Sequence, residues 1–266
     1  TLKKRRDWLK KEYYVEPPAP APTASSQVSA TNAAATAVTP ETNSEHLDLQ
    51  ATGKKVGHHG IMHVCKSEGE WKNRQFIVKD YSGTPDRAAT EHAANLFYKR
   101  MGIPVMNTRV QDGKLVAKTE HGLAALDESI NLKDLGEGFV VDAWLANWSV
   151  IGTSSHNIRK RSNGELVRTN NNGSMFFRFE GNPKSTFANA EVTEINSMRK
   201  TGSPAGNVFG KMGLSQGQII SQVKKLNATM TDDVISEIID SSGLENTEKV
   251  KKALRDRRDW LVSEYL

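Results

Sequence analysis

The pattern of apolar and polar residues divides the chain into an N-terminal part with no core-forming pattern and a longer part that has one. Residues 15–50 hold five of the nine prolines together with long Ala, Thr, Ser and Asn stretches, and large apolar side chains are nearly absent before Leu47. Such a segment cannot bury enough apolar surface to offset the entropy lost on ordering. We therefore predict a disordered linker over residues 15–50, stiffened by proline at its start and flexible later.

Short strand-like segments follow the linker. The first pair, 56–66 and 74–81, flanks a charged turn that contains Gly69, and the second pair, 104–111 and 114–120, meets at an Asp-Gly hairpin signal. These segments are rich in β-branched and aromatic residues, which favour strands. The pattern predicts two hairpins.

A helix is predicted between the two hairpins, over residues 84–102. Thr84 stands at the N-cap position, Pro85 and Asp86 form the first turn, and Gly102 ends the helix. An apolar stripe runs along one side through Ala89, Ala93, Leu96, Phe97 and Met101. The order strand, strand, helix, strand, strand predicts a small β-rich lobe at about residues 51–125.

The remaining residues, about 126–266, predict a larger and mainly helical lobe, so the expected fold class is α+β with two lobes. Residues 138–151 are apolar nearly all round, which is typical of a helix buried on most sides. Two strand candidates, 156–160 and 165–169, surround an Asn-Gly turn. Further helices are predicted at 215–226, 231–241 and 246–265.

A nine-residue motif occurs twice. RRDWLKKEY at Arg5–Tyr13 and RRDWLVSEY at Arg257–Tyr265 share seven of nine positions, at an offset of 257 − 5 = 252 residues. Such repetition is typical of units repeated in tandem. We therefore predict that residues 1–14 are the terminal helix of a preceding repeat unit and that neighbouring units of the same polypeptide are partners. In the second copy Leu254, Trp260 and Leu261 are expected to pack, and Arg257, Arg258 and Asp259 to point outward or form ion pairs.

Composition excludes several classes of function. The net charge is +5, of which residues 3–12 contribute +4 (six basic minus two acidic residues), and a solvated helix face explains such a run without nucleic acid. The sequence has no stretch of 18 apolar residues and no signal-peptide core, so we expect no membrane partner. Cys65 is the single cysteine, which excludes an internal disulfide and fits a cytoplasmic protein or one delivered into a reducing compartment. His63 and Cys65 lack a second ligand cluster, so we expect no zinc site.

The order of motifs resembles a protein-kinase-like fold: a glycine loop in a hairpin, a lysine on the next strand, a helix with a glutamate, a buried helix, and a strand pair ending in a polar turn. The stretches DAWLANWSVIGTSSHNI, at 142–158, and GELVRTNNNGSMFFRFEG, at 164–181, resemble the HipA-like and phosphatidylinositol-kinase-like branch. In its bacterial and phage members a helix ending in N-W-D is followed by an Asn and then by R-x-D-x-G-G-S. The resemblance covers roughly Thr52–Leu226 and suggests a phage or bacterial effector protein.

The resemblance implies a nucleotide site for ATP. Gly57 and Gly60, in VGHHG, match the loop that covers the phosphates, where glycines let backbone N–H groups approach anionic oxygens. Lys79 matches the nucleotide-binding lysine, and Glu91 matches the helix glutamate that holds it. Asn157 matches the second metal-binding residue. The spacing of Lys79 alone favours an ordinary edge-strand lysine, whereas the order of the motifs as a whole favours the nucleotide-binding lysine.

The chain departs from the pattern of this family at the two positions where phosphotransfer requires carboxylates. Ser149 stands at the position of the catalytic Asp, and Asn170 at that of the magnesium-binding Asp. Mg²⁺ is a hard cation that neutral Asn and Ser oxygens bind far less well than carboxylates do. Losing a general base typically costs on the order of 10²- to 10⁴-fold in rate. Bound Mg²⁺ is therefore doubtful.

No other carboxylate matches the missing positions in the sequence. Asp142 precedes Ser149 by seven residues, so on a continuous helix it would share that face but lie about 10 Å away. Glu165 and Glu180 flank the polar turn without matching its Asp position. These departures favour a pseudokinase-type nucleotide-binding or scaffold module in a tandem multidomain protein. Two alternatives stay open: an active ATP-dependent phosphotransferase of the serine/threonine-kinase type that uses displaced acids, and a purely structural repeat unit.

Overall fold

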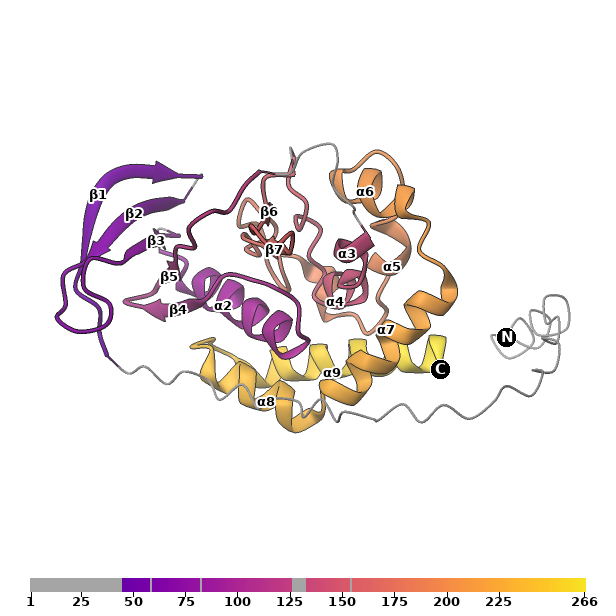
Figure 1. The fold of residues 1–266 in the computed structure, drawn as a ribbon. Helices are drawn as coiled ribbons and strands as arrows, with labels where there is room; N and C mark the ends of the chain where they lie inside the picture. Colours follow the sequence, from indigo (N-terminus) through magenta and orange to yellow (C-terminus); the bar gives the residue numbers. More distant parts are fainter. Residues whose placement is uncertain (1–44, 58, 82, 126–132, 154) are drawn as a thin grey trace, which may run out of the picture. The chain divides into compact units, whose positions relative to one another are not determined.

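The computed structural model describes residues 45–266 except 58, 82, 126–132 and 154, so the predicted helix 1–14 and residues 15–44 of the predicted linker lie outside the described residues. The described chain combines a small antiparallel sheet with a mainly helical C-terminal part (Figure 1). The predicted α+β fold with a β-rich lobe and a helical lobe is confirmed.

The β-rich lobe is built on a five-stranded sheet in the order β1-β2-β3-β5-β4, in which all neighbouring strands are antiparallel. Its strands are β1 Leu49–Val56, β2 Gly60–Cys65, β3 Gln75–Lys79, β4 Thr108–Gln111 and β5 Lys114–Lys118. The β4–β5 hairpin turns at Asp112 and Gly113, as the sequence predicted. The register pairs Gly60 with Lys79, which brings the start of β2 beside the end of β3.

Strand β1 was missed by the sequence reasoning, and it moves the start of the fold. The middle of β1 is exposed, so it lacks the alternation that reveals a half-buried strand. The glycine loop therefore joins β1 to β2, whereas residues 56–66 were predicted as one segment. Leu47, assigned to the linker, is 1% exposed and packs in a small cluster with Cys65 and Phe76. The fold therefore begins before residue 51.

Helix α2, Pro85–Arg100, follows the prediction and joins the two lobes. Pro85 opens it, although Thr84 at the N-cap makes no side-chain capping bond. The helix packs against β4 and β5 and also contributes to the core of the helical lobe. There the ring of Phe97 meets that of Trp144 edge-on, with centroids 5.1 Å apart.

The helical lobe contains a two-stranded sheet and the remaining helices. Its elements are α3 Lys133–Gly136, α4 Phe139–Trp144, β6 Ile158–Lys160, β7 Leu166–Arg168, the 3₁₀ helix Ser185–Ala188, α5 Glu194–Ser197, α6 Pro204–Met212, α7 Gln216–Thr229, α8 Asp232–Ser241 and α9 Thr247–Tyr265. Helices α7, α8 and α9 confirm the three predicted C-terminal helices. Ser215 and Thr231 cap α7 and α8 through their side chains.

The predicted buried helix over 138–151 is wrong in its length, because α4 ends at Trp144. Two buried basic side chains bind the carbonyl groups at this point. Arg257 donates to the carbonyl oxygens of Ala143 and Trp144, at 2.9 and 2.8 Å, and Lys184 donates to that of Ala146 at 2.7 Å. Ala146 adopts a positive φ of 52°, so the chain leaves the helix there. The buried residues after Trp144 form a turn instead.

Helix α9 docks through the repeated motif. Leu254 and Leu261 are fully buried, as predicted, and Trp260 packs partly against the same core. Arg257 was expected to point outward or form an ion pair, and it does pair, 2.9 Å from Glu194, but with its side chain fully buried. The helix therefore binds the lobe through a buried cation as well as through apolar contacts.

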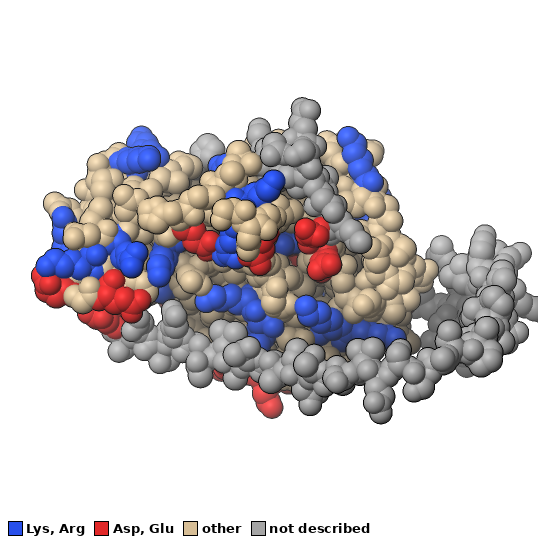
Figure 2. All heavy atoms as spheres, in the orientation of Figure 1, with Lys and Arg blue, Asp and Glu red and all other residues tan. Residues whose placement is uncertain are grey.

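The surface agrees with the limited charge of the chain. On the face shown in Figure 2, the described Lys and Arg side chains form separate groups interspersed with Asp and Glu. Among the described residues, no helix is both long and apolar enough to cross a membrane.

The Arg257→Ala variant is expected to lose about 3–5 kcal/mol of unfolding free energy, because it leaves Glu194 and the Trp144 carbonyl group buried without this partner and removes one of two donors to the Ala143 carbonyl. Urea denaturation followed by circular dichroism measures the loss. Lys252→Ala on the same helix is the control, since Lys252 is largely exposed and pairs with Asp256 at the surface; it is expected to change stability by less than about 0.5 kcal/mol. Equal effects of the two variants would contradict the role assigned to Arg257.

Candidate functional site

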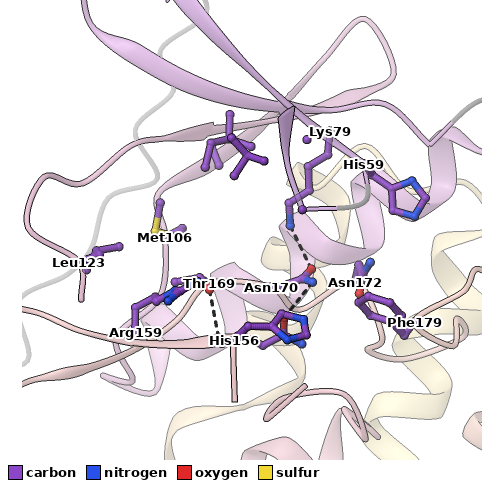
Figure 3. A pocket seen from close by; sticks show the side chains of 16 residues that line it. His59, Lys79, Met106, Leu123, His156, Arg159, Thr169, Asn170, Asn172 and Phe179 are labelled. Carbon is purple, nitrogen blue, oxygen red and sulfur yellow. Dashed lines mark hydrogen bonds between the residues drawn. The ribbon is translucent and has the colours of Figure 1, made fainter. Parts of the chain in front are cut away.

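A cleft of about 230 Å³ lies between the sheet and the helical lobe. Its apolar end includes Met106 and Leu123, and its polar end includes Lys79 and Asn170 (Figure 3). The complete lining comprises Val56, Gly57, His59, Gly60, Ile77, Lys79, Met106, Ala117, Leu123, His156, Asn157, Arg159, Thr169, Asn170, Asn172 and Phe179. An apolar cleft with a few polar groups at one end is the usual form of a small-molecule site.

The glycine loop borders this cleft, and its geometry requires both glycines. Gly57 has φ of 65°, a conformation that side chains disfavour. At Gly60 an added Cβ would lie 2.4 Å from the carbonyl oxygen of Val56 and 2.9 Å from a methyl carbon of Ile77. The loop therefore fits closely over the sheet. His58, between these glycines in the sequence, lies outside the described residues.

Lys79 and Glu91 meet at the polar end of the cleft. The Lys79 ammonium donates to one Glu91 oxygen at 2.7 Å, and Glu91 is 1% exposed on α2. The same carboxylate accepts the Tyr81 hydroxyl and the backbone N–H of Asn171. Burial, with the neighbouring Glu91 charge, raises the pKa of Tyr81, so its phenol stays protonated and donates. Glu91 thus has three donors and holds Lys79 in one position.

A line of amide hydrogen bonds runs from Lys79 across the floor of the cleft. The Lys79 ammonium donates to Asn170 Oδ1 at 3.0 Å, and Asn170 Nδ2 donates to Asn157 Oδ1 at 3.1 Å (Figure 3). Asn157 Nδ2 then donates to the Ser149 carbonyl oxygen at 2.6 Å. Asn157 and Asn170 stand at the two positions where the family resemblance implies metal ligands. The side-chain oxygen of each therefore already accepts a hydrogen bond.

Ser149 lies behind this line and not on the cleft wall. Its hydroxyl donates to Asn147 Oδ1 at 3.2 Å and lies so close to Gly173 that a Cβ there would be 1.9 Å away. Asn147 in turn bonds to Asn171, which bonds to Asn95. The structure therefore brings five of the predicted site residues to the cleft and sets Glu91 and Ser149 behind them. The five are Gly57, Gly60, Lys79, Asn157 and Asn170.

No Asp or Glu is among the described residues that line the cleft, whereas Lys79 and Arg159 are. Asp142 is fully buried and pairs with Arg168 at 2.7 Å. The expectation that Asp142 shares a helix face with Ser149 is wrong, because α4 ends between them. Glu165 binds Arg161, and Glu180 is exposed. Among the described residues no cluster of three or more His, Cys, Asp or Glu side chains could hold a metal ion.

The sequence reasoning missed several residues around the cleft. Tyr81 follows Lys79 by two positions, and period-two alternation could have indicated its shared face. His156 and Arg159 flank Asn157, but their direction depends on how β6 is placed, which sequence does not show. Asn172 is 2% exposed, and its Oδ1 has no partner among the described residues.

Lys184 connects the two loops behind the cleft. Its buried side chain donates to the carbonyl oxygens of Ala146 and Gly173, both at 2.7 Å. Burial lowers the pKa of Lys184 to about 7, with Glu194 opposing the shift and Arg257 adding to it. A neutral amine has two N–H groups, which match these two acceptors. Lys184 therefore fixes the turns that carry Ser149 and Asn170.

The comparisons with known proteins show a kinase fold. No protein-family model and no curated protein matches the chain. Among solved structures, the chain is similar to the Helicobacter pylori proinflammatory kinase CtkA, with a TM-score of 0.54 and 13% sequence identity, over 82% of this chain and 96% of that one. The described chain therefore has a kinase-like fold, as the sequence predicted.

The buried Lys184 predicts a pH-dependent stability. Its folded pKa of about 7 lies below its ordinary value of 10.5, so the unfolded chain binds more protons between these values and stability from this group rises with pH there. The slope is at most about 1.4 kcal/mol per pH unit. Urea denaturation at pH 7 to 9.5 is expected to show this rise in the wild type and a flatter dependence in Lys184→Met. Lys211→Met, at a less buried lysine, should retain the wild-type slope; a parallel slope in Lys184→Met would refute the assignment.

Proposed function

We propose that this kinase-like domain is a pseudokinase-type module that binds a nucleotide without a divalent metal ion. The observation that carries the proposal is the hydrogen bond between Asn170 and Asn157, the two positions at which the resemblance expects metal ligands. Their amides bind each other and Lys79, so they form a neutral surface in place of a metal site. The module would act by binding, either as a nucleotide receptor or as a scaffold.

The shape and polarity of the cleft support a nucleotide such as ATP as the ligand. The lining has an apolar part that suits a flat heterocyclic base. It includes Val56, Ile77, Met106, Ala117 and Leu123. Lys79 uses two of its three N–H donors on Glu91 and Asn170, which leaves one for a phosphate oxygen. The glycine loop, which borders the cleft, adds backbone N–H groups.

The same lining disfavours magnesium. Mg²⁺ is held in proteins by one or two carboxylates together with phosphate oxygens. The described lining offers amide oxygens that already accept hydrogen bonds, one of them from the Lys79 ammonium, and it also includes the charged Arg159. A cation entering here would have to displace these bonds without gaining a negative partner. Metal-free binding of the phosphate groups follows from this arrangement.

The two alternatives have less support in the described structure. A phosphotransferase that uses displaced acids needs a carboxylate in the cleft, and Asp142, Glu165 and Glu180 are engaged or exposed elsewhere. A purely structural unit has no need of an open cleft, whereas this one retains its volume, its glycine loop and the Lys79–Glu91 pair. Binding without phosphotransfer agrees with both sets of observations.

Isothermal titration calorimetry with ATP is expected to give an affinity in EDTA at least as high as in Mg²⁺, because the amides at Asn157 and Asn170 offer the metal no negative partner. Lys79→Ala is expected to weaken binding by about tenfold or more, as it removes a charge-assisted hydrogen bond of about 1.5–3 kcal/mol. Lys72→Ala, at an exposed lysine paired with Glu68, is the control and should bind as the wild type does.

Two results would contradict the proposal in different ways. Binding that requires Mg²⁺ and is followed by ATP turnover would support the phosphotransferase alternative. No binding of ATP under either condition, with a folded protein confirmed by its cooperative melt, would support the structural alternative.

Restoring one carboxylate is expected to create metal dependence. Asn170→Asp puts a negative charge beside Lys79 and Asn157, so Mn²⁺ or Mg²⁺ should raise the midpoint of thermal unfolding in the presence of ATP by more than in the wild type. Asn163→Asp is charge-matched and retains the side-chain oxygen that accepts the Glu165 N–H at an exposed turn. An equal metal response in both variants would show that the Asn170 position does not control metal binding.

A further inference from the structure

Two histidine side chains line the cleft that the proposed function assigns to a nucleotide. His59 belongs to the glycine loop, and its carbonyl oxygen accepts the backbone N–H of Asp80, the residue after Lys79. His156 directly precedes Asn157, whose side-chain oxygen belongs to the line of amides on the cleft floor. Figure 3 shows both rings toward the polar end of the cleft, where phosphate groups would bind.

This end of the cleft has little fixed positive charge for a polyphosphate. In kinases, metal ions neutralise the phosphate groups. Here the described lining contains no carboxylate that could hold such an ion, and the Lys79 ammonium is shared between Glu91 and Asn170. Arg159 also belongs to the lining, but it lies on the side of Leu123 in Figure 3. A bound polyphosphate therefore requires positive charge from further groups.

The surroundings of His59 include a second basic group. The ring of His59 lies 5.1 Å from that of Tyr81, measured between centroids, and the Arg87 guanidinium carbon lies 4.4 Å from the centre of the Tyr81 ring. The carboxylate of Asp80 pairs with Lys114 at 2.9 Å. A nearby cation and an engaged carboxylate both favour the neutral imidazole in the empty cleft.

The surroundings of His156 are uncharged along its own segment. Residues 143–158 contain no Asp, Glu, Lys or Arg. A Cβ added to Gly152 would lie 3.0 Å from the ring carbon Cε1 of His156, and the neighbouring Asn157 is a neutral amide. Glu91, the carboxylate behind the cleft, already has three donors. The charge of this ring therefore depends on what enters the cleft.

We propose that His59 and His156 become protonated when a nucleotide binds and so supply the positive charge that a metal ion would bring. This inference rests on the proposed function and names the groups that replace the metal in it. Histidine is the side chain that changes charge near neutral pH, and an approaching phosphate favours its imidazolium form. Each imidazolium can also donate a charge-assisted hydrogen bond to a phosphate oxygen. The protons come from the solvent, so binding weakens as the pH rises.

Isothermal titration calorimetry of the full chain with ATP in EDTA measures the proton uptake when it is repeated in two buffers of different ionisation enthalpy. The terminal phosphate of ATP titrates in the same pH range, so the contribution of the protein is the difference between the wild type and the double variant His59→Gln, His156→Gln. At pH 6.5 the wild type is expected to take up about one proton more than the double variant and to bind ATP about tenfold more tightly. The difference in affinity should shrink toward pH 9, where imidazoles are neutral.

His63→Gln is the matched control, because His63 lies on β2 close to the loop but outside the described lining. It is expected to take up as many protons as the wild type. Equal proton uptake and equal affinity in the wild type and the double variant at pH 6.5, with ATP bound by both, would overturn this inference and leave the proposed function standing. So would a difference in affinity that stays the same at pH 9, since the rings would then act as neutral donors. Absence of ATP binding at every pH, in a chain that melts cooperatively, would overturn both proposals.

Discussion

The structure depends on how the end of α4 is held. Arg257 and Lys184 are buried basic side chains from distant parts of the chain, and they bind the carbonyl groups of Ala143, Trp144 and Ala146. A helix end buried in a core leaves carbonyl groups that must find donors. Here the donors are side chains, so the backbone can turn immediately and present Asn147 and Ser149 toward the asparagine network. The position of the cleft floor follows from this turn.

The asparagine network gives the site its chemical character. In a kinase, carboxylates at these positions attract metal ions and accept protons; here Asn157 and Asn170 satisfy each other as donor and acceptor. The Lys79–Glu91 pair is present, and Tyr81 adds a donor to Glu91 behind the cleft. The kinase-like fold thus combines a buried Lys79–Glu91 ion pair with neutral amides at Asn157 and Asn170.

Features encoded by local sequence were predictable, and those set by distant contacts were not. The Asp112-Gly113 turn, the proline-initiated α2 and the capped helices α7 and α8 depend on neighbouring residues, and the sequence identified them. Strand β1 was missed because its exposed middle looks like a loop. The length of α4 was overestimated because Arg257, which binds the carbonyl groups at its end, is distant in sequence and leaves no signal in the apolar pattern of residues 138–151. The cleft residues Lys79, Asn157 and Asn170 were found through resemblance, whereas Arg159 and His156 depend on the placement of β6.

The docking of α9 also sets the order in which the chain can complete its fold during synthesis. Arg257 follows Trp144 by 113 residues, so at about 5–20 residues per second a ribosome needs about 6–23 s to add the donor after the acceptor. During that interval the carbonyl groups at the end of α4 have no guanidinium, and the turn that carries Ser149 lacks one of its two supports. The cleft therefore reaches its final shape late, after the helical lobe has been translated to α9, and a nascent chain that lacks this helix would present an unfinished site.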